Sequence, residues 1–130
     1  MKTFTVTRTL FGFPLTAAVS VLNDGVHVLL TGGCRTHVGA VTAVYGGKPE
    51  TVCFPGHKDD VISKMWAESL ADYLAERGFT ASSPEPGAAV TVACGIHYDG
   101  VSKEQIRAIV SGCADMLREV KETIAHKMRV

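Results

Sequence analysis

The first half of the chain alternates apolar and polar residues with the two-residue period of half-buried β-strands. Two such rows come first, formed by Phe4, Val6 and Leu10 and then by Leu15, Ala17, Val19 and Val21. The next residues, Asn23, Asp24 and Gly25, favour a tight hairpin because Asn and Gly readily adopt positive φ. Further strands are predicted over residues 26–31, 38–45, 51–54 and 90–96.

Two later segments change to the period of an amphipathic helix. The first has an apolar stripe of Ile62, Met65, Trp66, Ser69, Leu70, Tyr73 and Leu74. Asp59 and Asp60 suit its N-terminus, with Asp60 as the expected cap, and Gly78 suits its C-terminal stop. The second helix is expected to begin at Ser102, because its spacing to Gln105 matches a capping box. Its apolar face comprises Ile106, Ile109, Val110, Cys113, Leu117, Val120 and Ile124.

Several strands, a helix, a strand and a closing helix predict an α+β fold. The simplest arrangement is a two-layer sandwich, in which a mostly antiparallel sheet of about six to seven strands carries both helices on one face. Residues 82–87 are expected to form a surface loop too short to link domains, so residues 1–130 are predicted to be a single domain. The uncovered sheet face predicts a homo-oligomer, because a second copy can bury it.

Composition then narrows the class of protein. The chain of 130 residues is 46% hydrophobic and 20% charged, as expected of a globular rather than a disordered protein. Lys+Arg and Asp+Glu both number 13, so the balanced charge gives no basic surface for nucleic acid. The sequence has no apolar run long enough for a signal peptide or a membrane span. The protein is therefore expected to be cytoplasmic, with no nucleic-acid or membrane partner.

The four cysteines, Cys34, Cys53, Cys94 and Cys113, are scattered and contain no CxxC pair. In a reducing compartment we expect buried free thiols rather than disulfides. The sequence also lacks the G-x-S-x-G motif of serine hydrolases, and no catalytic residue is assigned.

Three segments place one histidine each beside glycines at the end of a predicted strand. These are TGGCRTHVG (31–39), FPGHKDD (54–60) and GIHYDG (95–100). Their histidines, His37, His57 and His97, could converge on a divalent metal ion, since neutral imidazole is a common ligand for zinc. The alternative is three unrelated histidines on the surface, because the spacing matches no local metal motif.

A cysteine precedes each of these histidines, which raises a second metal hypothesis. Positions 94 and 97 of one strand point to opposite faces, so Cys94 is expected in the core and His97 outside it, and cysteine ligation is disfavoured.

Other residues of the three segments suit a ligand instead of a metal. Arg35 and Lys58 could hold a phosphate, the amides of Gly32 and Gly33 could face an anion, and Tyr98 could stack on a ring. Asp59, Asp60 and Asp99 could orient imidazoles or cap turns and helices.

Taken together, TGGCRTHVGAVT (31–42), ETVCFPGHKDDVIS (50–63) and VTVACGIHYDGVSKEQI (90–106) resemble the LpdD-like prenylated-flavin chaperone family. Members of this family are the small D subunits of gallate-type decarboxylase systems. The three motifs occur in the family's order and cover roughly a third of the chain. The matching positions are Gly32, Gly33, His37 and Gly39, then His57, Lys58 and Asp59, and finally Gly95 and His97.

The resemblance implies an accessory protein without its own turnover. Such a protein binds prenylated FMN and assists its oxidative maturation or its delivery to a UbiD-type decarboxylase. The residues expected at the flavin are Gly32, Gly33, Arg35, His37, Gly39, Lys58, Asp59, Gly95 and Tyr98.

Two alternatives stay open at this level. One is a small three-histidine metal-dependent hydrolase, which would turn over substrates without a partner. The other is a structural subunit of a decarboxylase complex, which would bind its partner but no flavin.

Overall fold

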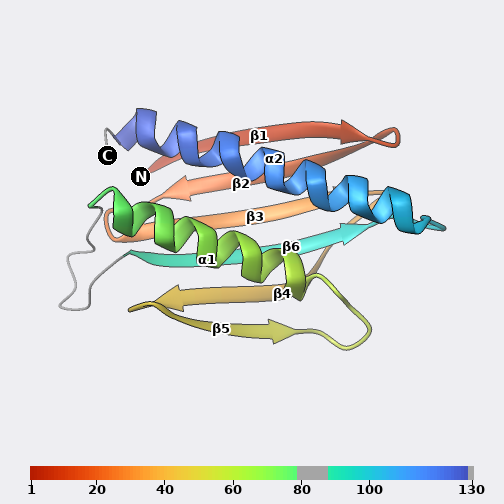
Figure 1. The fold of residues 1–130 in the computed structure, drawn as a ribbon, viewed down its shortest axis with the longest axis horizontal. Helices are drawn as coiled ribbons and strands as arrows, with labels where there is room; N and C mark the ends of the chain where they lie inside the picture. Colours follow the sequence, from red (N-terminus) through yellow and green to blue (C-terminus); the bar gives the residue numbers. More distant parts are fainter. Residues whose placement is uncertain (79–87, 129–130) are drawn as a thin grey trace.

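The computed structural model describes residues 1–78 and 88–128 (Figure 1). The loop predicted over residues 82–87 lies outside this part of the chain. The elements follow in the order β1 (Lys2–Leu10), β2 (Phe13–Val21), β3 (Gly25–Gly33), β4 (Arg35–Tyr45), β5 (Lys48–Cys53), α1 (Asp60–Glu76), β6 (Ala89–His97) and α2 (Lys103–Met128).

The six strands form one sheet in the order β1-β2-β3-β6-β4-β5. All neighbours are antiparallel except β3 and β6, which run parallel. Both helices lie on the same face of this sheet (Figure 1). The predicted α+β two-layer sandwich is therefore confirmed. The insertion of β6 between β3 and β4 is a feature that the sequence pattern did not indicate.

The core lies between the sheet and the two helices. The apolar rows of β1, β2, β3 and β6 face the helices, which contribute fully buried side chains such as Trp66, Leu70, Met116 and Ile124. Burying a side chain of this size stabilises the fold by roughly 1.5–3 kcal/mol. None of the described helices has the length and apolar character needed to cross a membrane.

The helix ends follow local rules with one exception. Ser102 and Gln105 form the predicted capping box, with each backbone N–H donating to the other's side chain, at 2.8 and 3.1 Å. Gly78 has a φ of +74° and follows the end of α1, as expected of a helix stop. The prediction of Asp60 as the cap is wrong, because α1 begins at Asp60 and Asp59 occupies the N-cap position. Asp59 forms no side-chain cap bond there, since its carboxylate faces the sheet.

Two residues of the predicted α2 core stripe are not buried. Ile106 and Val110 are 48% and 37% exposed, although Ile109, one position before Val110, is buried. The prediction of four buried thiols is also wrong for two of them, because Cys34 is half-buried and Cys53 exposed. The other two, Cys94 and Cys113, are buried free thiols, and burial raises the pKa of Cys113 to about 12. These departures cluster around the ends of β4 and β6, where the three histidine segments meet.

Candidate functional site

The chain passes from β3 to β4 around the C-terminal end of β6. Gly33 and Arg35 both pair with His97, so the single residue Cys34 makes the connection. The N–H of Cys34 donates to the carbonyl of His97 at 2.8 Å. Gly33 has a φ of +90°, and a Cβ there would overlap that same carbonyl. A glycine is therefore required for this close turn.

Two residues further on, β4 bulges away from β6. Thr36 pairs with Ile96 and Ala40 with Cys94, so three residues of β4 lie opposite one of β6. That one residue is Gly95, where a Cβ would overlap the carbonyl of His37. Bulges commonly redirect a side chain at a functional site, and here the bulged segment begins with His37.

The bulge and the β5–α1 connection bring the three predicted histidines together. The ring centroids of His37 and His57 are 5.1 Å apart, and those of His37 and His97 are 6.0 Å apart. The Nδ1–H of His57 donates to the carbonyl of Pro55 at 3.0 Å, because a carbonyl only accepts. This bond leaves Nε2 of His57 with the lone pair.

Asp59 fastens α1 to the bulge. Its Oδ1 accepts the N–H of Ile96 at 3.0 Å, and its Oδ2 lies 3.4 Å from Nε2 of His37. The side chain is only 8% exposed. A Cβ at Gly39 would overlap Oδ2 of Asp59 and would lie 2.7 Å from the His57 ring. Asp59 therefore satisfies a strand N–H and positions His37, which is the imidazole-orienting alternative of the sequence analysis.

A second polar group surrounds His97. Its Nε2 lies 2.9 Å from Oδ1 of Asp99 and 3.2 Å from a guanidinium nitrogen of Arg35. The thiol of Cys34 donates to Oδ2 of Asp99 at 3.4 Å. The hydrogen bond with His97 and then that with Cys34 lower the pKa of Asp99. The carboxylate is therefore ionised at neutral pH.

The histidines border two pockets of different character. The first, of about 320 Å³, is lined by His37, Gly56, His57, Lys58, Asp59, Ile62, Ile96, His97, Tyr98, Val101, Ile106, Ile109 and Val110. We call it the apolar pocket, because most of its side chains away from the histidines are aliphatic. The second, of about 340 Å³, is the polar pocket, lined by Arg35, Thr36, His37, His57 and His97. All three imidazoles are shared by both linings.

Tyr98 reaches the apolar pocket from an aromatic cluster. Its ring meets Phe11 and Phe13 edge-on, with centroids 6.1 and 6.0 Å away. Its hydroxyl donates to the carbonyl of Leu10 at 3.0 Å, and burial raises the pKa of that hydroxyl. Residues at the β1–β2 turn thus hold the ring of Tyr98, which the sequence analysis proposed as a stacking residue.

Most of the predicted site residues meet at this end of the sheet, but Gly32 has a separate role. A Cβ at Gly32 would overlap the side chain of Leu15, so packing in the core explains this glycine. The two predicted cations are divided between the pockets, Lys58 lining the apolar one and Arg35 the polar one.

Sequence reasoning missed Ile106 and Val110 as pocket residues. Both residues lie in the first turns of α2, shortly after the segment that contains His97. Their closeness in sequence to that polar motif could have indicated that they line the site.

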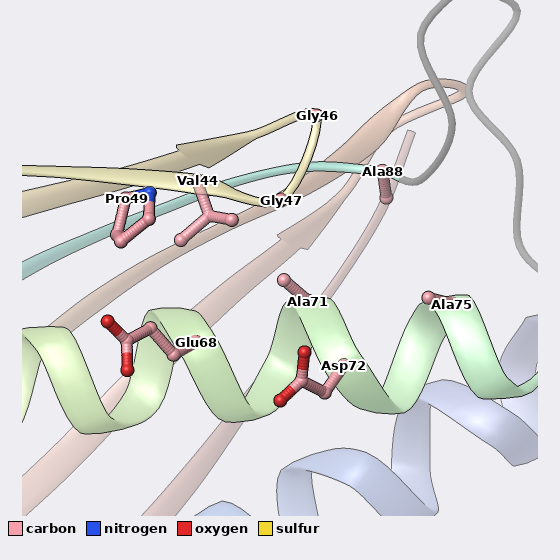
Figure 2. Close-up of a pocket in the computed structure, with 9 residues that line it drawn as sticks. All are labelled: Val44, Gly46, Gly47, Pro49, Glu68, Ala71, Asp72, Ala75 and Ala88. Carbon is pink, nitrogen blue, oxygen red and sulfur yellow. The ribbon is translucent and has the colours of Figure 1, made fainter.

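The largest of the three pockets, of about 400 Å³, lies at the other end of β4 (Figure 2). It is lined by Val44, Gly46, Gly47, Pro49, Glu68, Ala71, Asp72, Ala75 and Ala88. Figure 2 shows the carboxylates of Glu68 and Asp72 on α1 beneath the β4–β5 turn. We call it the acidic pocket, and among residues 1–78 and 88–128 its lining includes no cation or imidazole. It suits an anionic ligand poorly in spite of its size.

Comparison with known proteins identifies the family. Residues 10–125 match the family model described as "Prenylated flavin chaperone LpdD-like domain". Protein LpdD of Lactiplantibacillus plantarum is 31% identical over 126 residues, covering 92% of this chain and 82% of that protein. Among solved structures, a chain of a chaperone complex for yeast 20S proteasome assembly has a TM-score of 0.39 and 16% identity, covering 92% of this chain and 98% of that one. A TM-score this low gives no support to any functional conclusion.

Proposed function

This chain belongs to the LpdD-like prenylated flavin chaperone family, and on that premise we propose that it binds prenylated FMN at the three histidines and hands it to a UbiD-type decarboxylase. The single observation that carries the proposal is the pair of unlike pockets with His37, His57 and His97 in both linings. When bound, the flavin supplies the redox and decarboxylation chemistry of the partner enzyme, while this chain supplies binding and protection.

The apolar pocket suits the ring system and prenyl carbons of the cofactor. Ligand pockets of roughly 300–1,000 Å³ lined by aliphatic and aromatic groups bury most of a small molecule. Ile96, Ile106 and Val110 supply aliphatic contact surface. The partial exposure of Ile106 and Val110 is then explained, because a ring placed on them would remove that apolar surface from water.

The polar pocket suits the phosphate end. Arg35 is the one lysine or arginine among the described residues of its lining, and a guanidinium can bind two phosphate oxygens at once. Thr36 adds a hydroxyl donor from the same strand. Lys58 belongs to the apolar pocket, so we assign it to polar atoms of the flavin ring or ribityl chain and not to the phosphate.

Asp59 and the glycines preorganise the histidines. Asp59 holds Nε2 of His37 while bonded to the backbone of β6, and Gly39 and Gly95 leave the room that this arrangement needs. A rigid site reduces the entropy lost on binding, which favours retention of a reactive cofactor. Ile62 of α1 and the aliphatic residues of α2 in the lining would shield one side of the bound ring from water.

The first test is an anaerobic titration of the purified chain with reduced prenylated FMN, with absorption spectra before and after the admission of air. The wild type is expected to bind and to change the course of oxidation. His37→Ala is expected to weaken flavin binding at least about tenfold, the loss of roughly one good polar contact. His27→Ala is the matched control, because His27 is exposed near the start of β3, away from the pocket linings, and lies 2.6 Å from the Thr91 hydroxyl.

Delivery is tested in a second experiment. A UbiD-type decarboxylase co-produced with the His37→Ala variant is expected to contain less active cofactor than one co-produced with His27→Ala. Equal flavin affinity and equal partner activity for the two variants would refute the assignment of His37. Tight association with the decarboxylase without any flavin binding would instead favour a structural subunit.

A further inference from the structure

A separate feature of the same sheet end is a compact set of metal-ligand donors. Within residues 1–78 and 88–128, Cys34, His97 and Asp99 are the group of such side chains whose donor atoms all lie within 4.8 Å of one another. It shares only His97 with the three-histidine set that the sequence suggested.

The three donors are held in place by backbone. Cys34 is fixed by its N–H bond to the carbonyl of His97, and its Sγ lies 3.3 Å from that same oxygen. His97 is the last residue of β6, paired on both sides, and Asp99 follows two residues later. This placement depends on β6 lying between β3 and β4, which brings residues 34 and 97 into contact.

Two contacts of His97 require opposite hydrogen-bonding roles of the same ring nitrogen. Nε2 of His97 lies 2.9 Å from a carboxylate, which only accepts, and 3.2 Å from a guanidinium, which only donates. One neutral nitrogen cannot serve both. A cation between Cys34, His97 and Asp99 would use the lone pair of Nε2 and the charge of Asp99 together, and Arg35 would turn into the polar pocket that it already lines.

We propose that Cys34, His97 and Asp99 form a three-ligand site for a zinc-class divalent cation, with a fourth position open to water or a ligand. One thiolate, one imidazole and one carboxylate are a donor set that zinc and cobalt accept in tetrahedral geometry. Donor atoms in such a site lie roughly 3–4 Å apart, so the observed spacing requires only small side-chain rotations. Binding releases the thiol proton of Cys34 to solvent, and it requires the neutral imidazole tautomer that carries its hydrogen on Nδ1, so that the lone pair of Nε2 is available to the metal.

The test uses Co²⁺ as a spectroscopic probe on the full chain, stripped of metal and kept reduced, with no flavin present. The wild type is expected to bind one equivalent with a sulfur-to-cobalt charge-transfer band, and Zn²⁺ should displace the cobalt. Cys34→Ser should abolish the band. Cys53→Ser is the matched control and should keep it, because Cys53 is the other cysteine outside the core.

Three further variants decide between the ligand sets. Asp99→Asn should weaken cobalt binding at least about tenfold, and it should not impair folding because this side chain is 83% exposed. His37→Ala and His57→Ala should leave the charge-transfer band in place. The proposal is overturned if the wild type shows no charge transfer, if Cys34→Ser retains it, or if cobalt binding is lost in both histidine variants. Because no flavin is present, none of these results depends on the flavin titration.

Discussion

The two ends of β4 and α1 carry pockets of similar size and opposite chemistry. At the start of β4, the apolar and polar pockets share three imidazoles and include Arg35 and Lys58. At its far end, the acidic pocket is larger, at about 400 Å³, but the described residues that line it are two carboxylates and small or apolar residues (Figure 2). Pocket volume therefore does not distinguish the two ends, whereas the chemistry of their linings does, because the imidazoles and the two cations gather at the start of β4.

Three glycines at these two ends are required for different reasons. At the histidine end, a Cβ on Gly39 or Gly95 would overlap another segment of the protein. At the acidic end, Gly47 has a φ of +75° and nothing within 4 Å of its would-be Cβ. Gly39 and Gly95 are therefore needed for space, and Gly47 is needed for a turn conformation. This contrast gives four predictions, ordered from the largest expected effect.

The largest effect is expected from adding one methyl group at Gly95. Gly95→Ala places a Cβ against the carbonyl of His37, so we expect a loss of unfolding free energy of about 3 kcal/mol. Gly47→Ala meets no neighbour and bears only the strain of positive φ, about 1 kcal/mol. Urea unfolding of both variants measures the difference, and equal losses would contradict the distinction between the two glycines.

The next effect concerns Asp59. Asp59→Ala leaves the N–H of Ile96 without its acceptor, which is expected to cost about 2 kcal/mol. Asp59→Asn keeps an accepting oxygen and should lose less than about 1 kcal/mol. Asp72→Ala, at the exposed acidic end, should change stability by no more than about 0.5 kcal/mol. If Asp59→Ala and Asp72→Ala had the same urea midpoint, the fastening role of Asp59 would be wrong.

A third prediction tests the apolar pocket through the proposed flavin binding. Ile106→Glu adds a charge to a half-exposed pocket residue, so it should weaken the affinity for prenylated FMN about tenfold, or about 1.4 kcal/mol. Val61→Glu adds the same charge on α1 at a residue 67% exposed and outside the pocket lining, and should bind normally. The anaerobic titration measures both, and a similar affinity for the two would exclude Ile106 from the site.

The smallest effect is a pH dependence from Asp99. Its pKa is lowered in the folded protein, so the folded state holds fewer protons at this group than the unfolded state does. The resulting stabilisation is present above the ordinary aspartate pKa of 3.8 and is lost as the pH falls through the lower, folded pKa. Between about pH 6 and pH 3, the urea midpoint of Asp99→Asn should therefore fall less than that of the wild type. A parallel fall would contradict this contribution.

Much of the fold could be predicted because it depends on local periodicity. The alternation of β1 and β2, the stripe of α1 and the capping box at Ser102 each lie within a few residues of sequence. The motifs around His37, His57 and His97 were likewise recognisable, and the family comparison confirms the resemblance that they carried. Four expectations stay predictions: the binding of prenylated FMN, the decarboxylase partner, the metal ion and the homo-oligomer.

By itself, the sequence determined which faces of the strands and helices are apolar, because side-chain period follows directly from backbone geometry. It also determined that three histidines stand beside glycines at strand ends. Only the tertiary structure decided that β6 enters between β3 and β4, since strand order depends on which distant surfaces bury each other. With β6 in this position, Cys34 lies at the C-terminal end of β6, and the carboxylate of Asp59 accepts a hydrogen bond from β6 instead of capping α1. Ile106 and Val110 line a pocket at the same end of the sheet. The donors therefore meet across more than 60 residues of chain, a contact that no local pattern encodes.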